Sequence, residues 1–183
     1  MSTLVYALLV LAVGGERLLE LRVARRNAAW SFARGGVEHG TSHYPFMVAL
    51  HAALLLGCVV EVVLASRPFM PVLGYPMLAL LVLAQMLRWW CIGVLGPQWN
   101  TRVIVVPGSS RVAIGPYRWL RHPNYLAVAL EGIALPLVHT AWLTAAVFTL
   151  LNAPLLAIRI RCEESALGIH LREAGHGALE HGA

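Results

Sequence analysis

The stretch GPYRWLRHPNYLAVALEGIALPL, residues 115–137, joins a polar motif directly to an apolar run. The polar part holds a Gly-Pro turn, two arginines, two tyrosines and a His-Pro step, and the part after Pro123 is apolar enough to enter a bilayer. Polar and ionisable groups are costly inside a membrane, and they mark functional sites there. We therefore expect the functional site at this junction, where a water-soluble cofactor can meet a lipid-soluble substrate.

The composition of the rest of the chain is also that of a membrane protein. Of the 183 residues, 58% are hydrophobic and 13% are charged, and the mean hydropathy is +0.68. A soluble domain carries roughly a quarter charged residues, and a chain of this size has too little interior to hide so many apolar side chains. The sequence predicts an all-α integral membrane protein.

Five apolar segments are candidate membrane helices, because roughly 20 residues cross about 30 Å of hydrocarbon. The first becomes amphipathic at Glu16; it is predicted to be a retained span rather than a signal peptide, since no basic region precedes it. The fourth is short, and Pro154 is expected to interrupt the fifth. The predicted spans are residues 3–22, 44–65, 71–95, 123–138 and 142–160.

The distribution of the arginines predicts the orientation of these spans. All 14 basic residues are Arg; ten of them lie in two connections and in the tail, whereas the opposite turns hold only Arg67. Because positive residues favour the cytoplasmic side, we expect the C-terminus and the functional site in the cytoplasm. The charges are scattered, so nucleic acid is not an expected partner. The arginines in question are Arg25, Arg26, Arg34, Arg102, Arg111, Arg118, Arg121, Arg159, Arg161 and Arg172.

Little of the chain is predicted to lie outside the membrane. Two β-rich runs, 102–106 and 111–114, flank a Pro-Gly-Ser-Ser turn and predict a short cytoplasmic hairpin. Residues from 160 to about 172 predict a cytoplasmic helix. The three cysteines lack metal-ligand spacing, so no metal is expected. We predict a single domain, 1–183, with its cofactor-binding part at about 96–173.

The His122-Pro123 step predicts the start of the fourth helix. A residue before proline leaves the helical region, and proline is favoured at the first helical position. The helix then presents its positive end to the cytoplasm, a natural site for a carboxylate or another anion. Arg118 and Arg121 add charge there, and Tyr125 is near enough to His122 to line the same pocket.

A second polar group follows the fifth span. Arg159 and Glu163 are four residues apart and share a helix face. They either form a surface ion pair, or Glu163 or Glu164 faces the fourth helix and binds the positive part of a ligand. Within the spans, Glu131 either pairs with Arg88 or substrate, or forms a structural hydrogen bond. The other in-span polar residues are His51, Glu61 and Gln85.

These motifs resemble the isoprenylcysteine carboxyl methyltransferase family, membrane enzymes that use S-adenosylmethionine. The resemblance covers residues 96–167 and rests on Gly115-Pro116-Tyr117, Arg121-His122-Pro123-Asn124-Tyr125, and Arg159 with Glu163-Glu164. It implies cofactor contacts from His122 and Tyr125, with Tyr117 and the hairpin strand near the adenosine. The predicted cofactor-binding residues are Val105, Val106, Tyr117, Arg121, His122, Pro123, Tyr125, Glu163 and Glu164, and the predicted catalytic residues are Arg159, Glu163 and Glu131.

The front half, with ERLLELRVARRN, ARGGVEHG and HYPFMVALH, is similar to a bacterial branch of that family. Members of this branch accompany type III polyketide synthases and O-methylate alkylpyrones or alkylresorcinols. The resemblance implies a multi-pass protein of the bacterial inner membrane, with a lipophilic acceptor and membrane lipids as partners and an oligomer possible. Two alternatives are open: an NADPH-dependent membrane reductase, since sterol reductases carry a similar RHPxY stretch, and a non-enzymatic membrane module.

Overall fold

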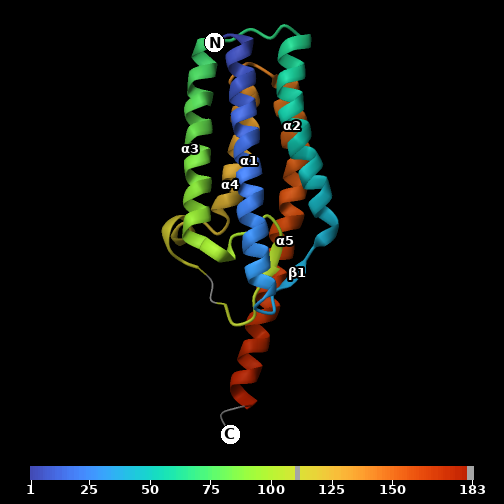
Figure 1. Ribbon diagram of the computed structural model, residues 1–183, viewed down its shortest axis with the longest axis vertical. Helices are drawn as coiled ribbons and strands as arrows, with labels where there is room; N and C mark the ends of the chain where they lie inside the picture. The colour runs from blue at the N-terminus through green and yellow to red at the C-terminus, as the bar shows by residue number, and fades with distance from the viewer. Residues whose placement is uncertain (110–111, 181–183) are drawn as a thin grey trace.

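A computed structural model describes residues 1–109 and 112–180, with side chains placed through residue 168. Five helices and a two-stranded sheet make up this part of the chain (Figure 1). Three short 3₁₀ turns connect them. The elements are α1 (Thr3–Phe32), β1 (Val37–His39), η1 (Thr41–His43), α2 (Tyr44–Leu64), α3 (Pro71–Leu95), η2 (Gly96–Gln98), β2 (Val103–Val105), η3 (Gly115–Arg118), α4 (Pro123–Leu137) and α5 (Trp142–Glu180).

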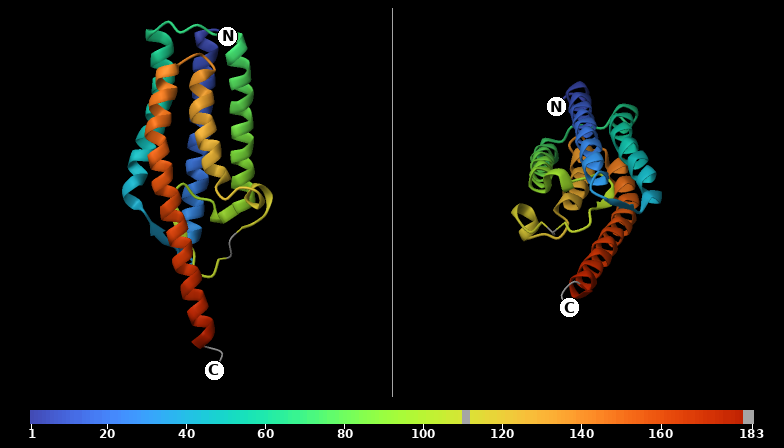
Figure 2. Two further views of the ribbon diagram at one scale, coloured as in Figure 1. Left: turned by 180° about the vertical axis from the view of Figure 1, so that it is seen from behind. Right: turned by 60° about the horizontal axis from the view of Figure 1, so that its bottom comes forward.

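The helices stand side by side in one bundle, with α4 inside it (Figures 1 and 2). Helix α4 packs against α3, α5 and α2, and α1 packs against α2. The N-terminus and the α2–α3 and α4–α5 turns lie at one end of the bundle. The sheet and the long connection from α3 to α4 lie at the other, where α5 continues beyond the bundle (Figure 2). The start of α4 therefore faces the end that holds the sheet.

Three helices are long and apolar enough to cross a membrane: Thr41–Leu64, Pro71–Gln98 and Trp142–Gly168. Large apolar side chains such as Leu56, Val72 and Leu150 are exposed on their surfaces, as lipid contact requires. Helices also occupy the other two predicted spans, but α4 has 15 residues and α1 carries Glu16, Arg17 and Glu20. The count of five spans and their orientation stay predictions.

The starts of α3 and α4 lie at the predicted prolines, Pro71 and Pro123. The predicted interruption at Pro154 is wrong, because α5 runs without a break from Trp142 to Glu180 and absorbs the separate tail helix. Proline inside a membrane helix is tolerated where local adjustment and neighbouring helices satisfy the freed backbone groups.

The predicted hairpin is also wrong. Strand β2 pairs antiparallel with β1, with Val37 opposite Val105 and His39 opposite Val103. Residues 112–114 form no strand, and Arg111 lies outside the described residues. The partner strand comes from the distant loop after α1, where Gly35 adopts a left-handed backbone (φ 76°) and turns the chain back. Val103 and Val105 bury their side chains against Ala166 of α5, and this burial fixes the sheet beside that helix.

Glu61 ties α2 to the start of α5. Its carboxylate accepts hydrogen bonds from the backbone N–H of Leu143 (3.1 Å) and of Thr144 (2.7 Å), and it pairs with Arg67 (2.9 Å). A carboxylate at a helix N-terminus satisfies free N–H groups and meets the positive end of the helix dipole. This contact sets where α5 begins.

Gly132 permits the close packing of α4 on α5, because a methyl group at this position would overlap the ring of Phe148. We expect Gly132→Ala to lower the melting temperature of the detergent-solubilised protein by about 5 °C, the effect of overpacking a core. The matched change Gly93→Ala meets no atom within 4 Å and should leave the melting temperature unchanged or slightly higher. Phe148→Leu should recover part of the loss in the Gly132→Ala background. Equal melting temperatures for Gly132→Ala and Gly93→Ala would contradict this packing.

Candidate functional site

The start of α4 meets one turn of α5 at the end of the bundle that holds the sheet. His122 occupies the N-cap position of α4 with a non-helical backbone (φ −133°, ψ 60°). Its ring stacks on that of Tyr125, with centroids 5.4 Å apart and an angle of 21° between the planes. Its Nε2 lies 3.3 Å from a carboxylate oxygen of Glu164 on α5. The His-Pro step thus places an imidazole between the two helices.

The hydroxyl of Tyr125 joins the two charged groups of the second motif. It donates a hydrogen bond to the carboxylate of Glu163 and accepts one from Nε of Arg159 at 2.9 Å. The guanidinium of Arg159 also lies over the Tyr125 ring, 5.5 Å from its centroid. The sequence left two alternatives for Arg159 and Glu163: a surface ion pair, or a Glu163 that faces α4. Glu163 faces α4, and the hydroxyl of Tyr125 separates it from Arg159, so the direct ion pair does not form.

Arg159 is buried, with 4% of its surface exposed. Besides Tyr125 it contacts the sulfur of Met47 at 3.5 Å. Among the side chains that the structure describes, no carboxylate forms an ion pair with it. A buried charge without a counter-charge is costly. The guanidinium is thus a place where an anionic ligand group gains more than it would at the surface.

Strand β2 and η3 complete the surroundings. Val105 and Val106 are buried, and β2 packs on α5 one turn beyond Glu163. Burial raises the pKa of the Tyr117 phenol well above its usual range; the Cys91 thiol beside it and the negative charge of Glu163 act in the same direction. Tyr117 is therefore a hydrogen-bond donor or acceptor here and not a base.

Two positions differ from the rest of the predicted set. The side chain of Arg121 is exposed. Asn124, in the middle of the motif, was not among the predicted contacts, yet its Oδ1 is buried with no hydrogen-bond partner among the described residues. An orphaned buried acceptor is unusual in a folded protein. A polar residue between His122 and Tyr125, at the first turn of an apolar helix, is the signal that would have singled it out.

Glu131 lies in a separate buried cluster. Its carboxylate is 2.5 Å from Arg88 of α3 and 3.3 Å from Arg17 of α1, and Arg17 also pairs with Glu20 at 2.7 Å. We call Arg17, Glu20, Arg88 and Glu131 the interior charge cluster. It realises the predicted pairing of Glu131 with Arg88, and none of the hydrogen bonds or ion pairs of Glu131 involves His122, Tyr125 or Glu163. Arg17 and Glu20 of α1 were not among the predicted site residues, although two charges three residues apart inside an apolar segment could have indicated them.

The architecture and the site together define a helical membrane protein with an ionisable site at one mouth of its bundle. The sequence pattern of the Isoprenylcysteine carboxyl methyltransferase (ICMT) family matches residues 77–169, about half of the chain. The chain belongs to this family, whose members are membrane methyltransferases that use S-adenosylmethionine as methyl donor. The matched segment contains α4, most of α3 and every named residue of the site at the start of α4 except Met47.

Two relatives are similar over most of their length. The chain is 40% identical over 153 residues to the uncharacterized protein YpbQ of Bacillus subtilis, covering 83% of this chain and 90% of that protein. It is 26% identical over 152 residues to an uncharacterized protein of Haemophilus influenzae, covering 82% and 88% respectively.

Removal of the Tyr125 hydroxyl, which bridges Arg159 and Glu163, should lower the stability of the folded protein. Tyr125→Phe keeps the ring stacked on His122 but takes hydrogen-bond partners from Arg159 and Glu163, and hydrogen bonds to charged groups contribute about 1.5–3 kcal/mol. We expect the melting temperature of the ligand-free protein in detergent to fall by roughly 5 °C. The control is Tyr44→Phe, whose hydroxyl makes only a neutral contact of 3.4 Å with Thr101. Equal losses in both variants would show that the bridge does not stabilise the site.

Proposed function

We propose that this protein is an S-adenosylmethionine-dependent O-methyltransferase that acts on a lipophilic acceptor. The observation that carries the proposal is the meeting of His122, Tyr125, Arg159 and Glu163 at the mouth of α4, in a chain of the ICMT family. We place the protein in the bacterial inner membrane as a multi-pass protein, with this site facing the cytoplasm. The arginines of the two long connections support the orientation.

The donor set of the site fits S-adenosylmethionine. The buried guanidinium of Arg159 suits the carboxylate of the methionine part. The carboxylates of Glu163 and Glu164 suit its ammonium group or the ribose hydroxyls, and the side chain of Glu164 is half exposed, with 50% of its surface accessible. The orphaned Oδ1 of Asn124 needs a donor that a ligand N–H or O–H can supply. We propose that the apolar side chains of Val105 and Val106 and the ring of Tyr117 contact the adenine.

The bound cofactor supplies an electrophilic methyl group on a sulfonium, which an oxygen nucleophile of the acceptor displaces. The task of the protein is alignment, which can contribute several kcal/mol to a two-substrate reaction. An acceptor carboxylate needs no base. A phenol, with a pKa near 10, needs one, and His122 beside Glu164 is the imidazole in reach of the junction. We propose that Arg159 contributes by holding the carboxylate of the cofactor, which aligns the methyl group with the acceptor oxygen.

The acceptor molecule would extend from the site into the bilayer. We propose a carboxylate or a phenol or enol attached to a hydrocarbon chain, such as a prenylated cysteine or an alkylpyrone or alkylresorcinol. The chain would reach the site from the membrane while the charged cofactor enters from the cytoplasm. We also propose that Glu131, the buried carboxylate of α4, takes part in catalysis.

Cofactor binding separates this function from its alternatives. We expect calorimetry of the purified protein to show saturable binding of S-adenosylhomocysteine and no binding of NADPH. Tight NADPH binding without a response to S-adenosylhomocysteine would establish the reductase instead. Binding of neither would support a non-enzymatic module.

Two substitutions test the site itself. Glu163→Gln removes a carboxylate that the ligand's positive part needs, and His122→Ala removes the imidazole that orders Glu164. Each should weaken S-adenosylhomocysteine binding at least about tenfold, the loss expected for one charge-assisted hydrogen bond. Expression in membranes should be unchanged. The matched control Glu38→Gln alters a carboxylate that only pairs with Arg102 at the surface, and it should bind normally. Normal binding by both site variants would show that the cofactor lies elsewhere.

A further inference from the structure

His51 lies early in α2, within one helical turn of the site. It follows Met47, whose sulfur contacts Nη1 of Arg159 at 3.5 Å. Residues four apart lie one above the other on a helix, so His51 and Met47 share a face of α2. The ring of His51 also packs edge-on against Phe148 of α5, with centroids 5.4 Å apart. His51 therefore lies between α2 and α5, one turn farther from the mouth of the bundle than Arg159.

A backbone contact fixes the tautomer of the His51 ring. Its Nδ1 lies 2.8 Å from the carbonyl oxygen of Met47. A carbonyl oxygen can only accept a hydrogen bond, so Nδ1 carries the proton and donates it. In the neutral ring Nε2 then holds a lone pair and is an acceptor. Among the described residues His51 makes no other hydrogen bond, so Nε2 is available to a hydroxyl group.

The ring is accessible although it lies on the inner face of α2. Leu54 and Cys58, three and seven residues further on, share this face and are buried in the core. His51 is only partly buried. A ligand can therefore contact His51 without displacing the core.

The charges around His51 leave it able to gain and lose a proton. The charged groups that act on it are the carboxylate of Glu131 on α4 and the guanidinium groups of Arg17 and Arg88 on α1 and α3. Both arginines are paired with carboxylates, so none of these three charges is uncompensated. Arg159 of α5 is one turn away, and the carboxylate of a bound cofactor would compensate its charge.

We propose that Nε2 of His51 takes the proton from the methyl acceptor, and hence that the acceptor is a phenol or an enol rather than a carboxylate. The inference rests on the proposed function and specifies its substrate class. The acceptor O–H donates to Nε2, and its proton passes to this nitrogen as the oxygen forms a bond to the methyl carbon. The carbon–sulfur bond breaks and its electron pair stays on sulfur. The products are the methyl ether, S-adenosylhomocysteine and an imidazolium, which returns its proton to water.

The spacing of Arg159 and His51 suits the length of the cofactor. Arg159 is proposed to hold the carboxylate of the methionine part, and the sulfonium methyl lies at the other end of that part. Arg159 is level with Met47, and one helical turn, about 5.4 Å, separates this level from His51. A comparable length separates the carboxylate from the methyl group. An acceptor oxygen on Nε2 can thus lie next to the methyl group, on the side from which a lipid arrives.

Two other histidines lie nearer the mouth of the bundle. The ring of His122 lies beside Glu164, whose side chain is half exposed. His43 is buried at the N-cap of α2, two turns before His51. Of the three, His51 lies farthest into the bundle, where the hydrocarbon chain of an acceptor would enter.

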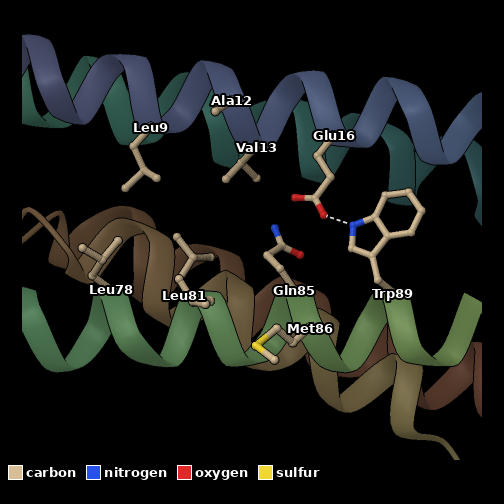
Figure 3. A pocket seen from close by; sticks show the side chains of 10 residues that line it. Leu9, Ala12, Val13, Glu16, Leu78, Leu81, Gln85, Met86 and Trp89 are labelled. Atoms are coloured by element: carbon tan, nitrogen blue, oxygen red, sulfur yellow. Dashed lines mark hydrogen bonds between the residues drawn. The ribbon is translucent and has the colours of Figure 1, made fainter.

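A groove of about 400 Å³ between α1 and α3 does not offer the same chemistry (Figure 3). Its polar end is formed by Glu16, Gln85 and Trp89, and the carboxylate of Glu16 accepts a hydrogen bond from the indole of Trp89. None of its lining residues is a histidine or belongs to the site at the start of α4. The proton acceptor of the reaction is therefore sought on α2.

The test compares two acceptors of different acidity, with the full-length protein in lipid nanodiscs. The probes are para-dodecylphenol and its ortho-nitro derivative, which ionises near neutral pH without a base. We expect His51→Gln to lower kcat for dodecylphenol at least about a hundredfold, the loss of a general base, and to lower it less than about threefold for the nitrophenol. Equal losses on both acceptors would assign His51 a structural role and overturn the proposal. Full activity of His51→Gln on dodecylphenol would overturn it as well.

A second measurement needs neither cofactor nor turnover. The visible absorption band of the nitrophenol belongs to its ionised form, so the spectrum of the bound probe reports whether its proton has passed to the protein. We expect the wild-type protein to increase this band over that in empty nanodiscs, and His51→Gln to lose the increase. The matched control His139→Gln alters a histidine at the opposite end of the bundle, beside the backbone of Met1, and should keep it. Equal spectra for wild type and His51→Gln would contradict the assignment.

Cofactor binding separates this inference from the proposed function. His51→Gln should bind S-adenosylhomocysteine normally, since His51 is not among the residues proposed to hold it. If the wild-type protein binds no S-adenosylhomocysteine, the proposed function fails. If it binds the cofactor but methylates dodecanoic acid and neither phenol, the function stands and the phenol or enol class is wrong.

Discussion

The ion pair between Arg88 of α3 and Glu131 of α4 is the constraint on which the rest of the bundle depends. Both side chains are almost completely buried, with 4% and 2% of their surfaces exposed. Removing one partner of such a pair costs about 3–5 kcal/mol, because the other charge is left uncompensated. Arg17 brings α1 to the same carboxylate. The three helices thus have one relative position that satisfies these charges, and the mouth of α4 is fixed with them.

Features encoded in short stretches of sequence could be predicted. Pro71 and Pro123 start helices because a missing N–H does no harm there and φ is already helical. The grouping of His122, Tyr125 and Glu163 could be predicted in outline, since the helix start sets the first two and four-residue spacing sets the face of the third. The local sequence predicts which side chains lie together at the start of the helix. The family resemblance predicts which ligand these side chains bind.

Long-range pairings could not be predicted in the same way. The partner of β2 is the segment Val37–His39, and nothing in either run distinguishes this pairing from the nearer 111–114 segment. Pro154 predicts a break locally, yet α5 packs on α2 and α4 and runs through this residue without interruption. The contribution of Arg17 to the interior charge cluster depends on how α1 is rotated. Each of these is decided by tertiary packing, which overrides local propensity.

The two buried arginines, Arg88 and Arg159, differ in how their charges are compensated. Arg88 contacts Glu131 directly, so the two charges compensate each other. Arg159 is separated from Glu163 by the neutral hydroxyl of Tyr125, so both charges stay fixed in position while neither cancels the other. Holding charges apart in a buried place is unfavourable for folding alone. A ligand that carries an anionic and a cationic group, as S-adenosylmethionine does in its amino-acid part, relieves both charges at once. The site is therefore better explained by binding than by stability.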